Sequence, residues 1–113
     1  MSTHKYSHRQ IDGILRQIGF QSHLKGYRFF LDSVYVVSNN KSAIYNISEL
    51  YGELASLYGI SVSGIERSIR TVIIKAWSEH RDRIYRFTDV PFVSRPTIKQ
   101  LIAAVSDGIN MIA

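Results

Sequence analysis

The chain has 113 residues, of which 45% are hydrophobic and 12% aromatic, so it is long enough for one core and too short for two domains. It has no cysteine, which excludes disulfides and thiolate metal sites, and no apolar run approaches the roughly 20 residues that cross a bilayer. Its formal net charge of +5 would attract nucleic acid, an anionic membrane surface or an acidic protein. We expect a soluble cytoplasmic domain, with nucleic acid favoured as the partner.

The first third of the chain predicts two helices. Residues 1–10 are polar and lack the features of a secretory signal, so we expect a flexible segment there. Four apolar residues then follow at the spacing of one helix face: Ile11, Ile14, Leu15 and Ile18. Gly19 is typical of a helix end. A second helix is predicted from about Leu24 to Val37. The β-branched end of this helix also suits a strand, but no hairpin turn lies nearby.

Two more helices are predicted on either side of a short turn. Asn46 and Glu49 have the spacing of a capping box, and the helix they open has an apolar face of Ile47, Leu50, Leu54 and Leu57. That helix ends at Gly59. The next helix begins at Ser61 or Ser63, runs to about Glu79, and has an apolar stripe of Ile65, Ile69, Val72, Ile73, Ala76 and Trp77. A last helix begins after Pro96, with Thr97 as its cap.

The middle pair forms a helix-turn-helix pattern. Gly59 can adopt the left-handed backbone that a sharp reversal needs. Ile60 can fill the angle between the two helices, and Ala55 is small where they would cross. We therefore predict an all-α fold, a bundle of about six helices, with a helix-turn-helix DNA-binding domain over residues 11–113.

Polar side chains lie opposite the apolar stripe of the second helix in this pair. Ser63, Arg67 and Arg70 share that face, and Glu66 and Thr71 lie on its flank. Arginine matches guanine with two hydrogen bonds in the major groove, and glutamate accepts one from cytosine. The side chains near the start of such a helix are the ones that enter the groove. The alternative is a solvated face on which Glu66 and Arg70 form an ion pair.

Four stretches of the chain together resemble one known family, the C-terminal DNA-binding effector domain of stage zero sporulation protein A, a response regulator of endospore formation. They are 65–70 (IERSIR) with 76–78 (AWS), 23–27 (HLKGY), 50–55 (LYGELA), and 95–97 (RPT) with residues 101–107. The resemblance spans about Ile11 to Ile109 in the family's order. It implies a six-helix domain that binds short DNA boxes, with two domains arranged head to tail on tandem boxes.

The resemblance also implies roles for individual residues. Glu66 and Arg67 would read bases, and Arg70 would contact a base or an adjacent phosphate. Ser61 and Ser63 would approach the DNA backbone. Trp77 falls on the apolar stripe, so it is interpreted as a packing anchor rather than as a stacking platform for bases.

The sequence departs from the family pattern in several places, among them Ile74 and Lys75, where an acidic position is exchanged for an apolar one. Gly64 stands where a basic residue is expected, which removes one DNA contact and weakens the start of the helix. Residues 81–93 form a shorter and more basic segment, in a region that neighbours the surface that contacts RNA polymerase. The receiver domain that accepts phosphate is absent from these 113 residues, so the chain is either an excised fragment or a stand-alone relative.

A basic cluster follows the predicted reading helix. Arg81, Arg83 and Arg86 alternate with Tyr85 and Phe87. The cluster could follow the DNA backbone, bind an acidic partner or form a solvated loop. We expect phosphate contacts from Arg81 and Arg83, because the cluster directly follows the reading helix.

Catalytic and metal-binding patterns are weak in this sequence. His4 and His8 are four residues apart, but no cysteine or well-spaced acid completes a tetrahedral site. His80 and Asp82 would suit a general base, but no nucleophile pattern or phosphate-binding loop accompanies them. We therefore expect no enzymatic activity, no cofactor and no bound metal.

The sequence predicts a sequence-specific regulator of transcription that binds double-stranded DNA. RNA polymerase is a candidate second partner, and no membrane association is expected. The alternative is a protein-interaction module, for example an antagonist that keeps the fold but binds a regulator instead of DNA.

Overall fold

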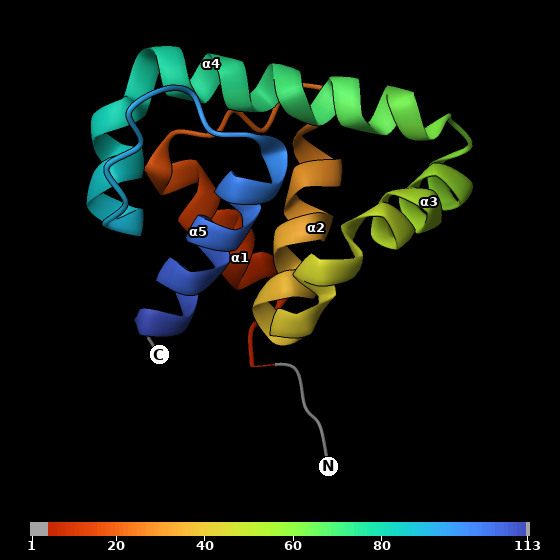
Figure 1. Cartoon of the computed structure of the whole chain (residues 1–113), viewed down its shortest axis with the longest axis horizontal. Coiled ribbons are helices and arrows are strands. Elements are labelled where there is room, and N and C mark those ends of the chain that lie inside the picture. Colours follow the sequence, from red (N-terminus) through yellow and green to blue (C-terminus); the bar gives the residue numbers. More distant parts are fainter. Residues whose placement is uncertain (1–4, 113) are drawn as a thin grey trace.

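The computed structural model describes residues 5–112, which form five α-helices and one 3-10 helix and contain no strand. This confirms the predicted all-α fold. The elements are α1 (His8–Ile18), α2 (Tyr27–Asn39), η1 (Lys41–Asn46), α3 (Ile47–Tyr58), α4 (Val62–Thr88) and α5 (Ile98–Met111). Helix α4 runs across one side of the domain, α1, α2 and α5 lie beneath it, and α3 flanks its first turns (Figure 1).

Helix α1 begins earlier than the sequence suggests. Ser7 and Gln10 form a reciprocal capping box, in which each side chain bonds the backbone N–H of the other residue. Tyr6 is only 8% exposed, and its hydroxyl donates to the carbonyl of Ile109 over 3.1 Å. The sequence predicts a flexible segment over residues 1–10. From Tyr6 to residue 10, however, the chain is packed, capped or helical. The helix ends at Gly19, in a left-handed conformation, as predicted.

Helix α2 is the central helix of the bundle. Phe30 and Val34 have no exposed surface, and the helix packs on α1, α4, α5 and η1. Its β-branched end is helical, which agrees with the prediction, because this segment is covered by neighbouring helices rather than by a partner strand. Only Asn40 separates the end of α2 from the start of η1.

The connection between α1 and α2 runs along α4 and lies against it. At one end Gly19 touches the ring of His80, and at the other Gly26 touches the backbone carbonyl of Ser68. Between them, the Gln21 amide donates to the Glu79 carboxylate over 2.7 Å. A Cβ on Gly26 would lie 2.0 Å from the Ser68 carbonyl oxygen. The absence of a side chain at Gly26 therefore allows this close backbone contact.

The helix-turn-helix has its predicted turn but not all of its predicted caps. Gly59 adopts a left-handed conformation (φ 68°), and Ser61 caps α4 by accepting a hydrogen bond from the Gly64 N–H over 3.0 Å. Of the two predicted starts for α4, Ser61 is the correct one. The predicted capping box at Asn46 is wrong, because its side chain makes no cap bond. Leu57 is also not part of the apolar face, since it is 72% exposed.

Helix α4 continues beyond the predicted end near Glu79. His80 has a non-helical backbone (φ −136°, ψ 33°), which kinks the helix, and a second segment then runs to Thr88. The basic residues 81–88 are therefore helical, and the loop alternative for them is wrong. The kink occurs where the His80 ring packs on Gly19.

Replacing Gly26 with alanine should lower the free energy of unfolding by about 1–3 kcal/mol, the usual cost of overpacking. The reason is the backbone contact with Ser68, which cannot move as a flexible side chain would. Urea unfolding followed by circular dichroism measures this. Gly13→Ala is the matched control: it lies inside α1 with no atom within 4 Å of the added Cβ, so it should stabilise by about 0.5–1 kcal/mol. Equal effects of the two variants would contradict the packing argument.

Candidate nucleic-acid interface

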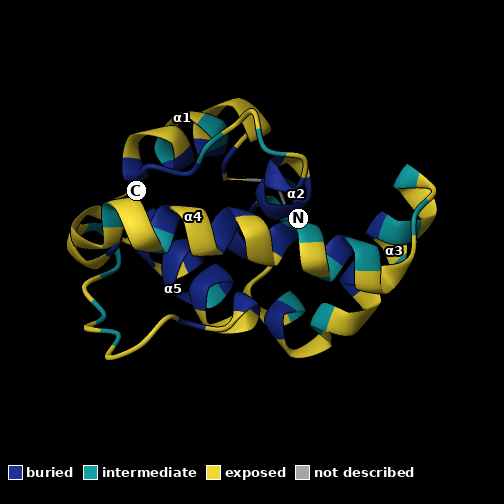
Figure 2. Cartoon of the chain, turned by 90° about the horizontal axis from the view of Figure 1, so that it is seen from above, coloured by how far each residue is buried: buried dark blue, intermediate teal, exposed yellow. Residues whose placement is uncertain are grey.

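The first segment of α4 is attached to the core along one stripe. Ile65, Ile69, Val72, Ile73 and Ala76 are each no more than 1% exposed. They recur at helical spacing and face the other helices, as the sequence predicts. Helix α4 lies on the outside of the bundle, and exposed residues recur along its length (Figure 2). The core therefore fixes both the position of this segment and the direction of its opposite face.

That opposite face is open to solvent. Ser63, Arg67, Arg70 and Thr71 are all exposed, and no other part of the described chain covers them. The hydroxyl of Thr71 donates to the carbonyl of Arg67 over 3.1 Å, so it is engaged within its own helix. The structure brings these four residues together on one protruding surface.

The start of α4 places two serines side by side. The hydroxyl oxygens of Ser61 and Ser63 are 3.3 Å apart, and either can be the donor. Both residues are exposed, and they lie beside the backbone N–H groups of the first turn. A helix N-terminus favours anions, because its N–H groups and dipole present positive charge there.

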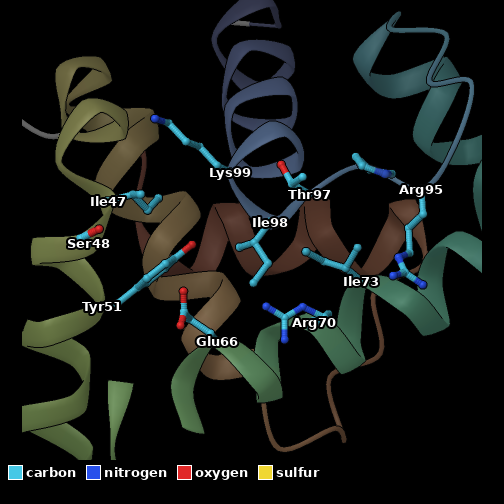
Figure 3. Close-up of a pocket in the computed structure, with 11 residues that line it drawn as sticks. Ile47, Ser48, Tyr51, Glu66, Arg70, Ile73, Arg95, Thr97, Ile98 and Lys99 are labelled. Atoms are coloured by element: carbon cyan, nitrogen blue, oxygen red, sulfur yellow. The ribbon is translucent and has the colours of Figure 1, made fainter. Parts of the chain in front are cut away.

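Glu66 and Arg70 lie on the edge of this surface and line a groove between α3, α4 and the start of α5 (Figure 3). Glu66 is partly buried. Both residues are described by the structure and lie four apart in sequence, but they form no ion pair. The alternative of a solvated face with a Glu66–Arg70 ion pair is therefore not observed. Tyr51 of α3 faces the same groove. Burial and, to a smaller extent, the nearby Glu66 carboxylate raise the pKa of the Tyr51 phenol to about 12, and Arg70 partly opposes this shift.

Arg81 and Arg83 lie apart from the other predicted site residues, beyond the kink. Arg81 is about 16 Å along the helix axis from Arg70. Its guanidinium lies over the Trp77 ring, 4.9 Å from the ring centre. Arg83 lines a shallow groove with apolar residues of α1 and with Phe87. Arg81 and Arg83 nevertheless line one small pocket together with Arg86, so part of the predicted basic cluster stays together.

Trp77 packs at the edge of the core and is only partly buried. Its ring meets Phe92 edge to face, with the ring centres 6.2 Å apart. This position agrees with the expected packing role, because the face of the ring is covered by Arg81 rather than open to a base.

His8 has structural partners. His8 Nε2 lies 3.2 Å from the Asp32 carboxylate, and its ring stacks on Tyr35; His4, its predicted companion, lies outside the described residues. Over residues 5–112 no group of three or more His, Cys, Asp or Glu side chains could hold a metal ion. In the same range no helix is both long and apolar enough to span a bilayer.

Sequence reasoning missed three residues that line the groove beside Arg70. They are Tyr51, Arg95 and Lys99. Arg95 and Lys99 flank the predicted cap at Thr97, which the structure confirms through a capping box with Gln100. The sequence holds no local signal that the start of α5 meets α4, because this contact joins segments far apart in the chain.

An all-helical domain with an exposed, arginine-bearing helix after a tight helical turn has the architecture of a nucleic-acid-binding effector domain. A family model described as "Sporulation initiation factor Spo0A C terminal" matches residues 11–109. The chain belongs to this family. The family is the DNA-binding effector domain of a sporulation regulator, so at family level its function is DNA binding and transcription regulation.

Ser61→Ala should lower the free energy of unfolding by about 0.5–2 kcal/mol, because the Gly64 N–H loses its side-chain acceptor at the N-cap. Thermal or urea unfolding of the free protein measures this. Ser63→Ala, two residues later, should stay within about 0.5 kcal/mol of the native protein. A larger loss of unfolding free energy in Ser63→Ala than in Ser61→Ala would place the start of α4 at Ser63.

Proposed function

We propose that this protein binds double-stranded DNA in a sequence-specific manner and regulates transcription, with the first segment of α4 inserted in the major groove. The observation that supports this most directly is the geometry of α4: a buried apolar stripe fixes the helix, and Arg67 and Arg70 project from its exposed side. A helix of this width fits the major groove of B-form DNA.

Arg67 is the principal base reader in this proposal. It lies at the centre of the exposed face and forms no ion pair with any described residue, so its guanidinium is free to bind the O6 and N7 atoms of guanine. Glu66, on the flank, accepts a hydrogen bond from a cytosine amino group. Arg70 contacts a base or the adjacent phosphate. Each good pairing of this kind contributes about 1–3 kcal/mol of discrimination.

Phosphate contacts fix the register of the helix. Ser61, Ser63 and Thr71 approach the DNA backbone close to the bases, and Arg81 and Arg83 contribute further along the duplex. Because Arg81 and Arg83 lie beyond the kink, their role is electrostatic rather than base-specific.

The resemblance to the family supports three further proposals. Two copies bind head to tail on tandem DNA boxes, the region after the kink faces RNA polymerase, and the protein acts in the cytoplasm.

A second candidate function is a protein-interaction module that binds a regulator. The observation in its favour is apolar surface at the helix-turn-helix: Leu57 is 72% and Val62 41% exposed. Gly64 also provides no side chain for DNA in the first turn of α4. Exposed apolar residues that lie close together are typical of contact surfaces.

One experiment separates the two functions. A random duplex library is selected against the protein, and the recovered site is compared with a scrambled duplex of the same length at physiological salt. Fluorescence anisotropy gives both affinities. A specific regulator should prefer its site by about 10³-fold or more. Equal and weak affinity for both duplexes would favour the interaction module.

Arg67→Ala should reduce the discrimination between the selected and scrambled duplexes by about 1–3 kcal/mol, because one base contact is lost. Competition binding at fixed salt measures the ratio. Unfolding by urea provides the control, since Arg67 is exposed and its removal should leave the fold intact. Unchanged discrimination would show that Arg67 is not a base reader.

Arg83→Ala should weaken binding to both duplexes equally and reduce the slope of log affinity against log salt by about 1, because it removes a phosphate contact. Affinities measured between low and physiological salt give the slope. A selective loss for the selected duplex would instead make Arg83 a base-reading residue.

A further inference from the structure

A groove of about 380 Å³ lies where α3, α4 and the start of α5 meet. Helix α3 contributes Ser48 and Tyr51, and helix α4 contributes Arg70. The α5 side contributes Arg95 and Lys99. Figure 3 shows these side chains along the groove, with Lys99 extending toward the α3 side, Arg95 at the opposite end near α4, and the Tyr51 phenol oxygen directed between them. The groove thus combines hydroxyl donors with three cationic side chains.

The Tyr51 ring is buried, and its hydroxyl opens to the groove without a protein partner. The residue is 5% exposed, yet its hydroxyl makes no hydrogen bond to any residue between 5 and 112. The hydroxyls of Tyr6, Tyr27 and Tyr58, by contrast, each bond a carbonyl or carboxylate. Buried phenol groups usually have a partner. The Tyr51 hydroxyl is therefore available to a ligand that enters the groove.

The charge of the groove favours an anion. Arg70, Arg95 and Lys99 form no ion pair with any described residue, and Glu66 is the only acid among the lining residues. The first turn of α5 also opens here. The N–H groups of Ile98 and Lys99 have no intrahelical acceptor, as expected for the first two positions of a helix. An anion in the groove would meet these donors and the positive end of the helix dipole.

We propose that this groove binds one phosphodiester group of the DNA backbone, next to the base-reading residues. The Tyr51 hydroxyl and the N–H groups of the first turn of α5 donate to the non-bridging oxygens, and Arg95 and Lys99 neutralise the charge. This inference rests on the proposed DNA-binding function and names the residues that position the helix. The source of the phosphate is the duplex, because the groove adjoins Glu66 and Arg70 on the flank of α4.

The position of α3 agrees with this source. In helix-turn-helix proteins the first helix of the pair crosses the DNA backbone while the second enters the groove. Ser48 and Tyr51 belong to the first half of α3, the helix that plays that part here. A phosphate held between α3 and α5 would fix the depth and the tilt of α4.

Tyr51→Phe removes the hydroxyl and keeps the ring, so the fold should survive. The affinity for both the selected and the scrambled duplex should fall about tenfold, as for loss of a hydrogen bond to a charged group. Lys99→Ala should also weaken both duplexes and reduce the salt slope by about 1. Lys41→Ala is the control, because it removes the same charge from an exposed site on η1, which packs on α2, α3 and α5 and where Lys41 pairs with Asp107 over 3.7 Å. Equal losses for Lys99→Ala and Lys41→Ala would overturn the proposal.

A methylphosphonate scan then identifies the phosphate itself. Each phosphate of the selected duplex is replaced in turn by an uncharged methylphosphonate, and the affinity of the native protein is measured. One position should lose affinity in the native protein and lose little in Tyr51→Phe and Lys99→Ala, because the contact is already absent. If every methylphosphonate lowers the affinity of Tyr51→Phe and Lys99→Ala by the same factor as the affinity of the native protein, the groove holds no backbone phosphate.

These outcomes separate the groove from the proposed function. If Arg67→Ala loses discrimination while Tyr51→Phe and Lys99→Ala bind as the native protein does, the function stands and the groove assignment fails. If the native protein does not discriminate between duplexes, both fail. Inorganic phosphate is titrated as well, with amide shifts of Ile98 and Lys99 as the readout. Binding tighter than about 1 mM would identify a site for a free anion and overturn the backbone assignment.

Discussion

The packing of the first segment of α4 on the core is the constraint on which the candidate interface depends. Each fully buried aliphatic side chain of the stripe contributes about 1.5–3 kcal/mol relative to exposure, and Ile65, Ile69 and Val72 have no exposed surface. The α1–α2 connection reinforces this from the side, where Gly26 meets the Ser68 carbonyl. With the helix held in this way, its exposed arginines need no further support to project into solvent.

The kink at His80 divides α4 into two parts with different surroundings. Before it, the helix has regular backbone angles and carries the exposed polar face. After it, Ile84 returns to the core with no exposed surface, and Arg81 and Arg83 turn towards Trp77 and α1. The change of direction limits the surface that can enter a groove to the segment before His80.

Local sequence patterns were sufficient for most of the helices and for the reading face. The apolar period of α4 identified its buried stripe, and Gly59, Ser61 and Thr97 marked helix ends because their conformations or caps depend on near neighbours. Apart from the helix caps at Ser7 and Asn46, the errors arose where contacts with a distant segment determine the structure. Leu57 fits the apolar period of α3, but no other helix covers it. The helical state of residues 81–88 depends on the burial of Ile84. The groove at Tyr51 depends on the packing of α5 against α4, and no local sequence pattern predicts that contact.

The bond between the Tyr6 hydroxyl and the Ile109 carbonyl joins residues near opposite ends of the chain. Both described ends therefore leave the bundle on the side away from α4 (Figure 1). A fluorophore, an affinity tag or another folded module attached at either end would be separated from the arginine-bearing surface by the full thickness of the bundle.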